Sequence, residues 1–224
     1  MPVGSARLRP GSAAGFEVAW DVTQMTADPA DPWLVPDRQC DGCTVCCAVL
    51  PIDTPQFQKQ SGVLCTHCAV GAGCTIHATR PPVCREWYCG WRYLAFLTDA
   101  MRPDRGGILP VFDTEDIPDG YSIRPAVKFI VTGGVEALRA MAFLEVVAAL
   151  ARQRLPMFLA APGPPGRHMA KSFLNAGLEA AAADGAPAGV NRVMEGIYAL
   201  LIKGDFEPIL LKNAPARGPR PLTF

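Results

Sequence analysis

The chain has 224 residues, 50% of them hydrophobic, and its 21 basic side chains are balanced by 21 acidic side chains. A chain of this length can bury roughly 70% of the surface of its unfolded state, so we expect a folded core and exclude intrinsic disorder. The neutral charge balance lacks the basic surface of nucleic-acid-binding proteins, and no apolar run reaches the ~20 residues that a membrane-spanning helix needs.

Residues 1–39 have glycine and proline at close intervals, including the run DPADPWLVP, which is typical of irregular structure. We expect this segment to form an irregular arm that lies over the rest of the protein, with Trp20 and Trp33 as its anchors. The first residues carry positive charge, but no apolar run of the kind found in secretory signals follows them. We therefore expect a cytoplasmic protein.

All nine cysteines lie between Cys40 and Cys89. An odd number of thiols, with Cys46 and Cys47 adjacent, argues against a framework of disulfides, because the cytoplasm keeps thiols reduced. Clustered thiolates need a cation to neutralise them, and zinc or an iron-sulfur cluster supplies that charge. Metal binding is therefore the leading prediction for this segment.

The first part of the cysteine segment reads CDGCTVCC, from Cys40 to Cys47. Each CxxC step lets two thiolates converge on one metal from a tight turn, and Gly42 supplies a permissive backbone position in the first step. Adjacent side chains generally point in different directions, so Cys46 and Cys47 suit two neighbouring metals better than a single one. The doublet therefore indicates two centres.

The spacing leaves three assignments of the thiolates open. The generic zinc template of two CxxC pairs about 15 to 20 residues apart is matched by Cys43, Cys46, Cys65 and Cys68. Nine thiols also suffice for two tetrahedral four-thiolate sites, with one thiol left over. The CxxCxxC run is similar to the spacing of iron-sulfur ferredoxins, although a CysCys step replaces the usual three residues before Cys-Pro.

The cysteine segment as a whole resembles the YkgJ-type cysteine-cluster family, whose members are described as zinc- or iron-chelating. The resemblance covers residues 40–91 and rests on the CxxCxxCC string, LCTHC, CTIHATRPPVC and WYCGW. It implies eight metal ligands, which are Cys40, Cys43, Cys46, Cys47, Cys65, Cys74, Cys84 and Cys89. Cys68 and His77 stand where the family more often has an apolar and an aromatic residue, so whether either adds or replaces a ligand is open at this point.

Few other charges accompany the thiolates in this segment. Two zinc ions with eight thiolates leave a net negative charge, which a site shielded from water tolerates only with amide donors and nearby cations. Arg80, Arg85 and Arg92 are the candidates for these cations, as residues that surround the ligands. We expect Trp87 and Tyr88 to pack over the cluster and exclude water.

The remainder of the chain is predicted to form strands and helices. The predicted strands are 107–113, 121–132 and 156–162, and Pro125 predicts either an edge position or a break in the second of them. The predicted helices are 91–101, 134–154, 169–183 and 190–203. Residues 213–224, rich in proline and arginine, are expected to form a flexible tail.

Together these observations predict an α+β protein in which an irregular cysteine-rich metal-binding module, residues 40–101, packs on a small sheet-and-helix body, residues 102–212. The predicted function is metal binding, with thiolates holding one or two zinc ions in a structural or regulatory role. An iron-sulfur protein with an electron-transfer or enzymatic role is the alternative, and metal storage or delivery is a third hypothesis. A protein partner fits the first of these, whereas no nucleic-acid or membrane partner is expected.

Overall fold

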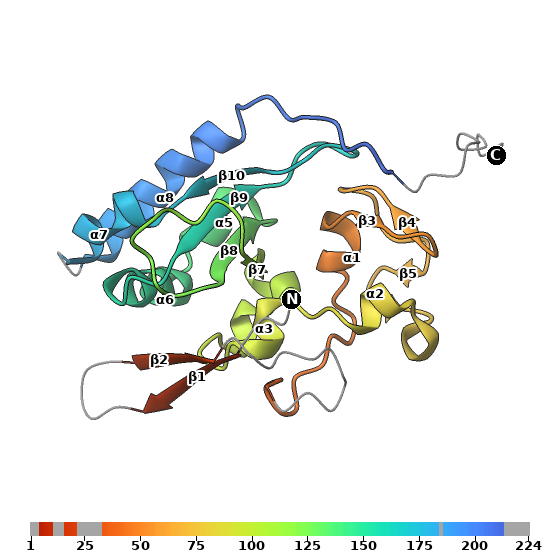
Figure 1. Ribbon diagram of the computed structural model, residues 1–224, viewed down its shortest axis with the longest axis horizontal. Coiled ribbons are helices and arrows are strands. Elements are labelled where there is room, and N and C mark those ends of the chain that lie inside the picture. The colour runs from red at the N-terminus through yellow and green to blue at the C-terminus, as the bar shows by residue number, and fades with distance from the viewer. Residues whose placement is uncertain (1–4, 11–15, 22–32, 184–185, 213–224) are drawn as a thin grey trace.

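The computed structural model of the chain describes residues 5–10, 16–21, 33–183 and 186–212, with the backbone alone for the first two ranges (Figure 1). Helices and sheets are both present, so the protein belongs to the α+β class, as the sequence predicts. Within these ranges, every helix is too short or too polar to cross a membrane.

A mixed sheet of four strands forms the centre of the protein. Its strands are β7 (Ile108–Asp113), β8 (Ala126–Val131), β9 (Met157–Ala161) and β10 (Ala170–Phe173), in the spatial order β10-β9-β8-β7. Strand β8 runs antiparallel to β7 and parallel to β9, and β10 runs antiparallel to β9. The parallel pair needs a crossover connection, which the helices α5 (Gly134–Leu138) and α6 (Met141–Arg152) supply.

Side chains of the central strands alternate between two covered faces of the sheet. On the first face, Ile108 and Phe129 belong to the main apolar cluster, which includes the buried side chains of the helices. On the second face, Leu109, Ile130 and Ala160 form a smaller cluster that contacts the cysteine segment. Burial on both faces explains why these strands are continuous apolar runs in the sequence.

Three helices pack on one another and cover the first face of the sheet (Figure 1). They are α6, α7 (Asn175–Ala183) and α8 (Pro187–Leu201). Their buried residues recur at helical spacing, as Phe143, Val147 and Leu150 do in α6. The helix predicted over 190–203 is confirmed as α8.

The three predicted strands are confirmed as β7, β8 and β9. The strand predicted over 121–132 begins only at Ala126, directly after Pro125, so the break expected at this proline is confirmed. The alternative, an edge position, is wrong, because β8 lies between β7 and β9.

The helix predicted over 134–154 is interrupted. The backbone of Ala140 is extended, with a ψ of 120°, and separates α5 from α6. Arg139, the residue that ends α5, donates a hydrogen bond from Nε to the Glu195 carboxylate of α8 at 2.7 Å. This tertiary contact lies at the end of α5, in a run that contains no helix-breaking residue.

The helix predicted over 169–183 is wrong in its first part, because Ala170–Phe173 pairs with β9 as strand β10. Helix α7 begins only at Asn175, whose side chain is fully buried. The Asn175 amide accepts a hydrogen bond from the Met157 N–H and donates one to the Leu155 carbonyl, both at 2.8 Å. A satisfied buried amide thus joins the start of α7 to the start of β9.

The helix predicted over 91–101 is also interrupted. Helix α3 (Gly90–Tyr93) ends after one turn, and the chain continues to the 3-10 turn η2 (Asp99–Met101). The guanidinium of Arg38 donates hydrogen bonds to the carbonyl of Trp91 and to further carbonyls of the following loop, and lies 4.8 Å from the centre of the Trp91 ring. These carbonyls therefore bind Arg38 instead of continuing a helix.

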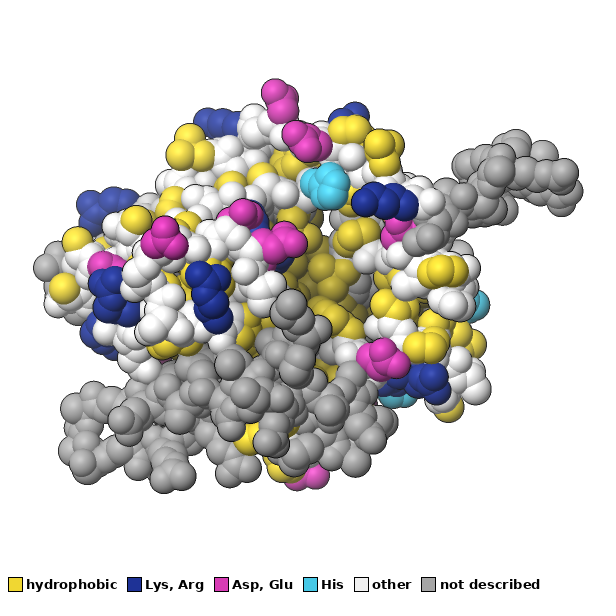
Figure 2. All heavy atoms as spheres, viewed as in Figure 1, with side chains coloured by type: hydrophobic (Ala, Val, Ile, Leu, Met, Phe, Trp, Pro, Cys, Tyr) yellow, Lys and Arg dark blue, Asp and Glu magenta, His cyan; other side chains and the backbone are white. Residues whose placement is uncertain are grey.

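Short elements joined by turns make up the cysteine segment. They are α1 (Val45–Val49), β3 (Ile52–Asp53), β4 (Gln58–Lys59), β5 (Cys68–Ala69), β6 (Gly73–Cys74), the 3-10 turn η1 (His77–Thr79) and α2 (Pro82–Arg85), and α4 (Pro103–Gly106) leads from η2 into β7. The segment packs on the second face of the sheet, opposite the helices (Figure 1). Figure 2 shows hydrophobic side chains gathered between these two sides of the molecule.

The N-terminal arm contains a hairpin of two antiparallel strands, β1 (Ser5–Pro10) and β2 (Phe16–Asp21). The prediction of an irregular arm is therefore wrong for these residues. The run FEVAWD alternates large apolar residues with smaller or charged ones, which is the pattern of a strand.

Trp33 packs against the cluster formed by Leu34, Tyr88 and Tyr93, as expected for an anchor of the arm. The side chain of the second predicted anchor, Trp20, lies outside the described part of the chain, and so does the predicted tail, residues 213–224.

Candidate metal centre

All nine cysteines lie in the described part of the chain, and all are free thiols. Short helices carry three of them, the β5–β6 hairpin carries two, and turns or helix caps carry the others. The thiols divide into two groups according to which other thiols interact with each one. The first group is Cys40, Cys43, Cys46 and Cys89, and the second group is Cys47, Cys65, Cys68, Cys74 and Cys84.

The first group lies where the CxxC turn meets the start of α3. The Cys43 N–H donates a hydrogen bond to the Cys40 carbonyl at 2.8 Å, which closes the turn. Burial, followed by electrostatic interaction with the nearby Cys40, raises the pKa of Cys89 to about 12. Cys46 lies close enough to Cys40 and Cys89 for their charges to raise its pKa as well. These four thiols are therefore electrostatic neighbours.

The second group surrounds the β5–β6 hairpin. Cys68 and Cys74 are directly opposite each other in the hairpin, and the Cys65 N–H donates a hydrogen bond to the Cys47 carbonyl at 3.0 Å. Burial raises the pKa of Cys84, and the charges of Cys47, Cys65 and Cys74 raise it further. Burial, followed by a hydrogen bond with Cys47, raises the pKa of Cys68 strongly. The five thiols of this group thus influence one another.

The adjacent residues Cys46 and Cys47 connect the two groups. Their Sγ atoms are 3.9 Å apart, yet Cys46 is near members of the first group and Cys47 near members of the second. A hydrogen bond from the Cys46 thiol lowers the pKa of Cys47 to about 6, and the same bond raises the pKa of Cys46. The hydrogen bond thus favours the thiolate form of Cys47, which is the form that binds a metal.

Two cations lie beside the second group. Lys59 is only 6% exposed, and its Nζ donates hydrogen bonds to three backbone carbonyls at distances of 2.8 to 3.1 Å. Burial lowers the pKa of Lys59, whereas the charges of Cys47 and other thiols of the group raise it. The Arg80 Nε donates to the Cys84 carbonyl at 2.9 Å, and the charges of Lys59 and Arg80 help to lower the pKa of Cys47.

Two further cations lie beside the first group. Burial lowers the pKa of Arg38, and the charges of Asp99 and Cys89 oppose that shift. A hydrogen bond with Asp104 raises the pKa of Arg102, and the charge of Cys43 raises it further, so this guanidinium also lies near the first group. Each group of thiols therefore has two basic side chains near it.

Close backbone contacts seat the β5–β6 hairpin on the CxxC turn. A Cβ atom at Gly73 would lie 2.2 Å from the Asp41 carbonyl oxygen, and Gly73 has a φ of 79°. A Cβ atom at Gly42 would lie 2.8 Å from the carbonyl oxygen of Gly71. No side chain fits at either position, so glycine is what lets the two groups of thiols lie next to each other.

The residues predicted to surround the ligands differ in their placement. Trp87 packs in the apolar cluster that also contacts Cys46 and Cys89. Tyr88 is buried close to the guanidinium groups of Arg92 and Arg80, and the Arg80 Nη2 donates a hydrogen bond to the Tyr88 hydroxyl at 3.3 Å. Arg85, in contrast, is exposed at the end of α2.

His77, the predicted candidate for an extra ligand, is exposed and contacts Arg80. Its Nε2 lies 2.5 Å from the Arg80 Nη1. Burial and the charge of Arg80 lower the pKa of His77. The ring nitrogen therefore faces a cation in this structure, which favours a hydrogen-bonding role.

In the described ranges, no group of three or more Cys, His, Asp or Glu side chains is arranged to hold a metal ion. The generic zinc template is divided between the two groups, since Cys43 and Cys46 belong to the first, and Cys65 and Cys68 to the second. The eight cysteines implied by the family resemblance divide four and four, with Cys68 as the additional thiol of the second group.

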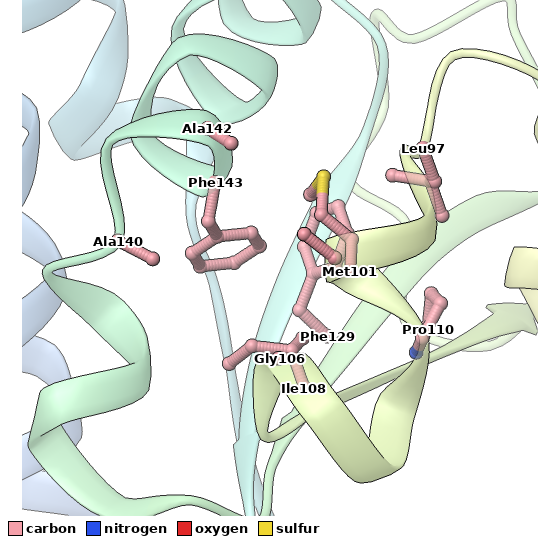
Figure 3. Close-up of a pocket in the computed structure, with 10 residues that line it drawn as sticks. Leu97, Met101, Gly106, Ile108, Pro110, Phe129, Ala140, Ala142 and Phe143 are labelled. Carbon is pink, nitrogen blue, oxygen red and sulfur yellow. The ribbon is translucent and has the colours of Figure 1, made fainter.

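A cavity of ≈ 70 Å³ lies elsewhere, between α6 and the loop around η2 (Figure 3). Its lining includes Leu97, Met101, Phe129 and Phe143, which point into it (Figure 3), and contains no titratable side chain. A catalytic pocket needs a few convergent polar groups, which this cavity lacks. The thiol groups are therefore the candidate functional site.

Lys59, Arg38 and Arg102 are the contributors that sequence reasoning missed. Lys59 is the single lysine between residues 40 and 89, and that isolation within a cysteine-rich run is the signal that points to it. Arg38 lies just before the first cysteine, where the sequence predicts only an irregular arm. Its position over the Trp91 ring has no local signature.

Comparison with known proteins yields no match. No described protein family, no curated protein and no solved structure matches this chain. The resemblance to the YkgJ-type family therefore rests on the cysteine motif alone.

Proposed function

We propose that the protein binds metal at two four-thiolate centres, with zinc as the metal, in a structural or regulatory role. The first centre uses Cys40, Cys43, Cys46 and Cys89, and the second centre uses Cys47, Cys65, Cys74 and Cys84. The observation that carries the proposal is the division of the thiols into two groups on either side of the Cys46–Cys47 pair.

The donor chemistry of both groups fits zinc. Closed structural zinc sites use four thiolates, and each group supplies four without histidine or carboxylate. The sulfurs must converge to about 2.3 Å from the ion, which requires rotations of the cysteine side chains. Lys59 and Arg80 beside the second group, and Arg38 and Arg102 beside the first, offset the negative charge that remains on a zinc ion with four thiolates.

A structural role agrees with the position of the segment. The cysteine segment covers the second face of the sheet, and its few buried side chains provide little apolar stabilisation. Metal–thiolate bonds would hold the cysteine segment on the sheet. If metal binding were regulated, the segment would stay folded there only while the metal is bound. The proposal requires a reducing compartment such as the cytoplasm, where the thiols stay free.

Elemental analysis of protein purified without oxygen or a metal-binding tag tests the proposal. We expect two equivalents of zinc and a colourless solution. Absence of any bound metal in reduced protein that retains its fold would refute the proposal.

Pairs of substitutions test the division into two centres. Cys46→Ser and Cys47→Ser should each lose one equivalent of zinc. Cys46→Ser combined with Cys89→Ser should still bind one equivalent, because both residues belong to the first centre. Cys46→Ser combined with Cys84→Ser should bind none, because each centre then lacks a ligand. Complete loss in both single variants would instead indicate one shared cluster.

An iron-sulfur protein is the second candidate, and the surroundings of the first group favour it. Cys46 and Cys89 contact an apolar cluster that includes Trp87 and residues of β7 and β8. Such an enclosed site limits solvent access, which is one of the factors that set the potential of a cluster. Iron with matching labile sulfide and visible absorption, in place of zinc, would establish this candidate.

A further inference from the structure

The β5–β6 hairpin places two cysteines opposite each other. Cys68 of β5 pairs with Cys74 of β6, and one further pair, Ala69 with Gly73, lies between them and the turn that joins the strands. Only Cys74 belongs to the proposed set of four ligands in the second centre. Cys68 is the additional thiol, and it has no counterpart in the motif that the segment resembles.

The register of the hairpin brings these two side chains close together. The Thr75 N–H donates to the His67 carbonyl at 2.8 Å, so the pair next to Cys68 and Cys74 is a hydrogen-bonded one. Pairs alternate in an antiparallel ladder, which makes Cys68 and Cys74 a non-hydrogen-bonded pair, with Cα atoms roughly 4.5 Å apart and both side chains on one face. A disulfide needs a Cα separation of about 4.4 to 6.8 Å, so this pair is within range.

Both cysteines are accessible to a small oxidant. Cys68 and Cys74 are each partly exposed, and their neighbours Ala69 and Thr75 are exposed. In contrast, Cys65 of the same group is buried. The hairpin thus presents the pair at the surface of the second group.

We infer that Cys68 and Cys74 form a reversible disulfide that withdraws Cys74 from the second centre, so that this centre releases its metal in response to a low-molecular-weight disulfide. The metal-release step rests on the proposed function, whereas formation of the disulfide does not.

The reaction is a thiol–disulfide exchange with a molecule such as oxidised glutathione. The raised pKa of Cys68 keeps its thiolate scarce, so the first step is slow. After the Cys68 thiol has lost its proton to water, the thiolate attacks one sulfur of the external disulfide, which forms a mixed disulfide and expels one thiolate. The Cys74 sulfur leaves the metal and attacks the Cys68 sulfur, which forms the Cys68–Cys74 bond and expels the second thiolate. The protein loses two electrons and the external disulfide gains them, leaving three thiolates on the metal.

Disulfide mapping and zinc release test this inference on the full chain. Reduced, zinc-loaded protein is treated with oxidised glutathione while a chromogenic chelator records free zinc, and alkylated peptides are analysed by mass spectrometry. We expect one of the two zinc equivalents to be released together with a Cys68–Cys74 crosslinked peptide. Added dithiothreitol should reverse both changes.

Cys68→Ser is the decisive variant, and Ala69→Ser, at the exposed neighbouring position of β5, is its matched control. Cys68→Ser should bind two equivalents when reduced and release zinc at least ~10-fold more slowly under oxidised glutathione, because no second thiol resolves the exchange. Ala69→Ser should release zinc at the rate of the natural chain. Equal rates for Cys68→Ser and the natural chain, or a crosslink joining Cys47 to Cys68 or to Cys46, would overturn the inference.

Metal-free protein separates this inference from the proposed function. If the reduced chain binds no metal, the proposed function fails, but the Cys68–Cys74 crosslink is still expected on oxidation. If two zinc equivalents bind and the crosslink does not form, only the inference fails.

Discussion

The two faces of the central sheet are covered by material of opposite kinds. The helical side buries a continuous apolar cluster that includes Phe143, Leu150 and Leu178. On the other side, the buried residues between 40 and 89 are Lys59, Ser61, Cys65, Gly73 and Tyr88. Apolar burial stabilises the body, whereas hydrogen bonds from buried polar groups and close backbone contacts hold the cysteine segment. The two regions should therefore respond differently to the same perturbation.

Metal removal is expected to have the largest effect. In small zinc modules about 10–16 kcal/mol of binding free energy is also folding free energy. A chelator should therefore open the cysteine segment while the sheet, which has its own apolar core, stays folded. Hydrogen exchange measures this directly, with amides of residues 40–89 losing protection and those of β8 and β9 keeping it. Equal loss of protection in both regions would contradict the comparison.

Truncation of the core should act on the body alone. Leu159 is fully buried in β9, so Leu159→Ala should lower the free energy of unfolding by about 2–5 kcal/mol. Bound zinc should stay at two equivalents, because no thiol is touched. Leu200→Ala, at a position that is 73% exposed, is the control, and its effect should stay within about 0.5 kcal/mol. Urea denaturation with metal analysis checks both expectations.

Gly73→Ala should act on the cysteine segment alone. The new Cβ would lie 2.2 Å from the Asp41 carbonyl, at a φ of 79°, so the hairpin must move away from the CxxC turn at a cost of about 2–4 kcal/mol. Gly71→Ala has nearly the same φ, 78°, but meets no atom within 4 Å, so it isolates the backbone strain. We expect weaker zinc binding by Gly73→Ala than by Gly71→Ala in a chelator competition. Equal affinities would show that the contact does not position the thiols.

The smallest expected effect concerns an ion pair of the body. Burial opposes ionisation of Asp113, but hydrogen bonds from Lys128 at 2.8 Å, the Glu115 N–H and Lys171 lower its pKa overall. A lowered pKa in the folded state contributes stability above the unfolded pKa, and this contribution is lost as pH falls through the folded value. Stability of the body should therefore decline below about pH 4.

Asp113→Asn should remove this acid dependence and cost about 1–3 kcal/mol near neutral pH, because it leaves two partly buried lysines without their carboxylate. Asp116→Asn is the control, since its carboxylate also contacts Lys171, at 3.0 Å, but is 74% exposed. Its effect should stay below about 1 kcal/mol. Urea denaturation of metal-free protein at several pH values measures both variants, because acid would release zinc from its thiolate ligands.

Much of the body could be predicted from sequence because its signals are local. Apolar runs bounded by proline and glycine indicate β7 and β9, and Pro125 indicates where β8 begins. The run that forms β10 lacks such a signal, because its strand conformation depends on pairing with β9, which is distant in the sequence. The extended residue Ala140 likewise has no signal in its own run, which contains no helix-breaking residue.

The sequence predicts which cysteines form the candidate site, but not how they divide into two groups. The density of cysteines singles out residues 40–89, and the Cys46–Cys47 doublet indicates two centres. Spacing alone does not show that Cys89 lies near Cys40, because the intervening chain first covers the sheet and then returns at α3. The buried cation Lys59 is equally invisible, since its partners are backbone carbonyls.

The strand order of the sheet also bears on self-association. The edge strand β7 has α3 and α4 against it, and Pro110 removes a donor at a position where the N–H would point away from β8. The other edge strand, β10, has four residues, including the ion-paired Lys171. Short, charged or proline-containing edges do not template a further strand. A copy that has lost the cover of its second face would thus expose apolar side chains to a neighbour, while the two edges of the central sheet, as described by residues 108–113 and 170–173, disfavour pairing with a further strand.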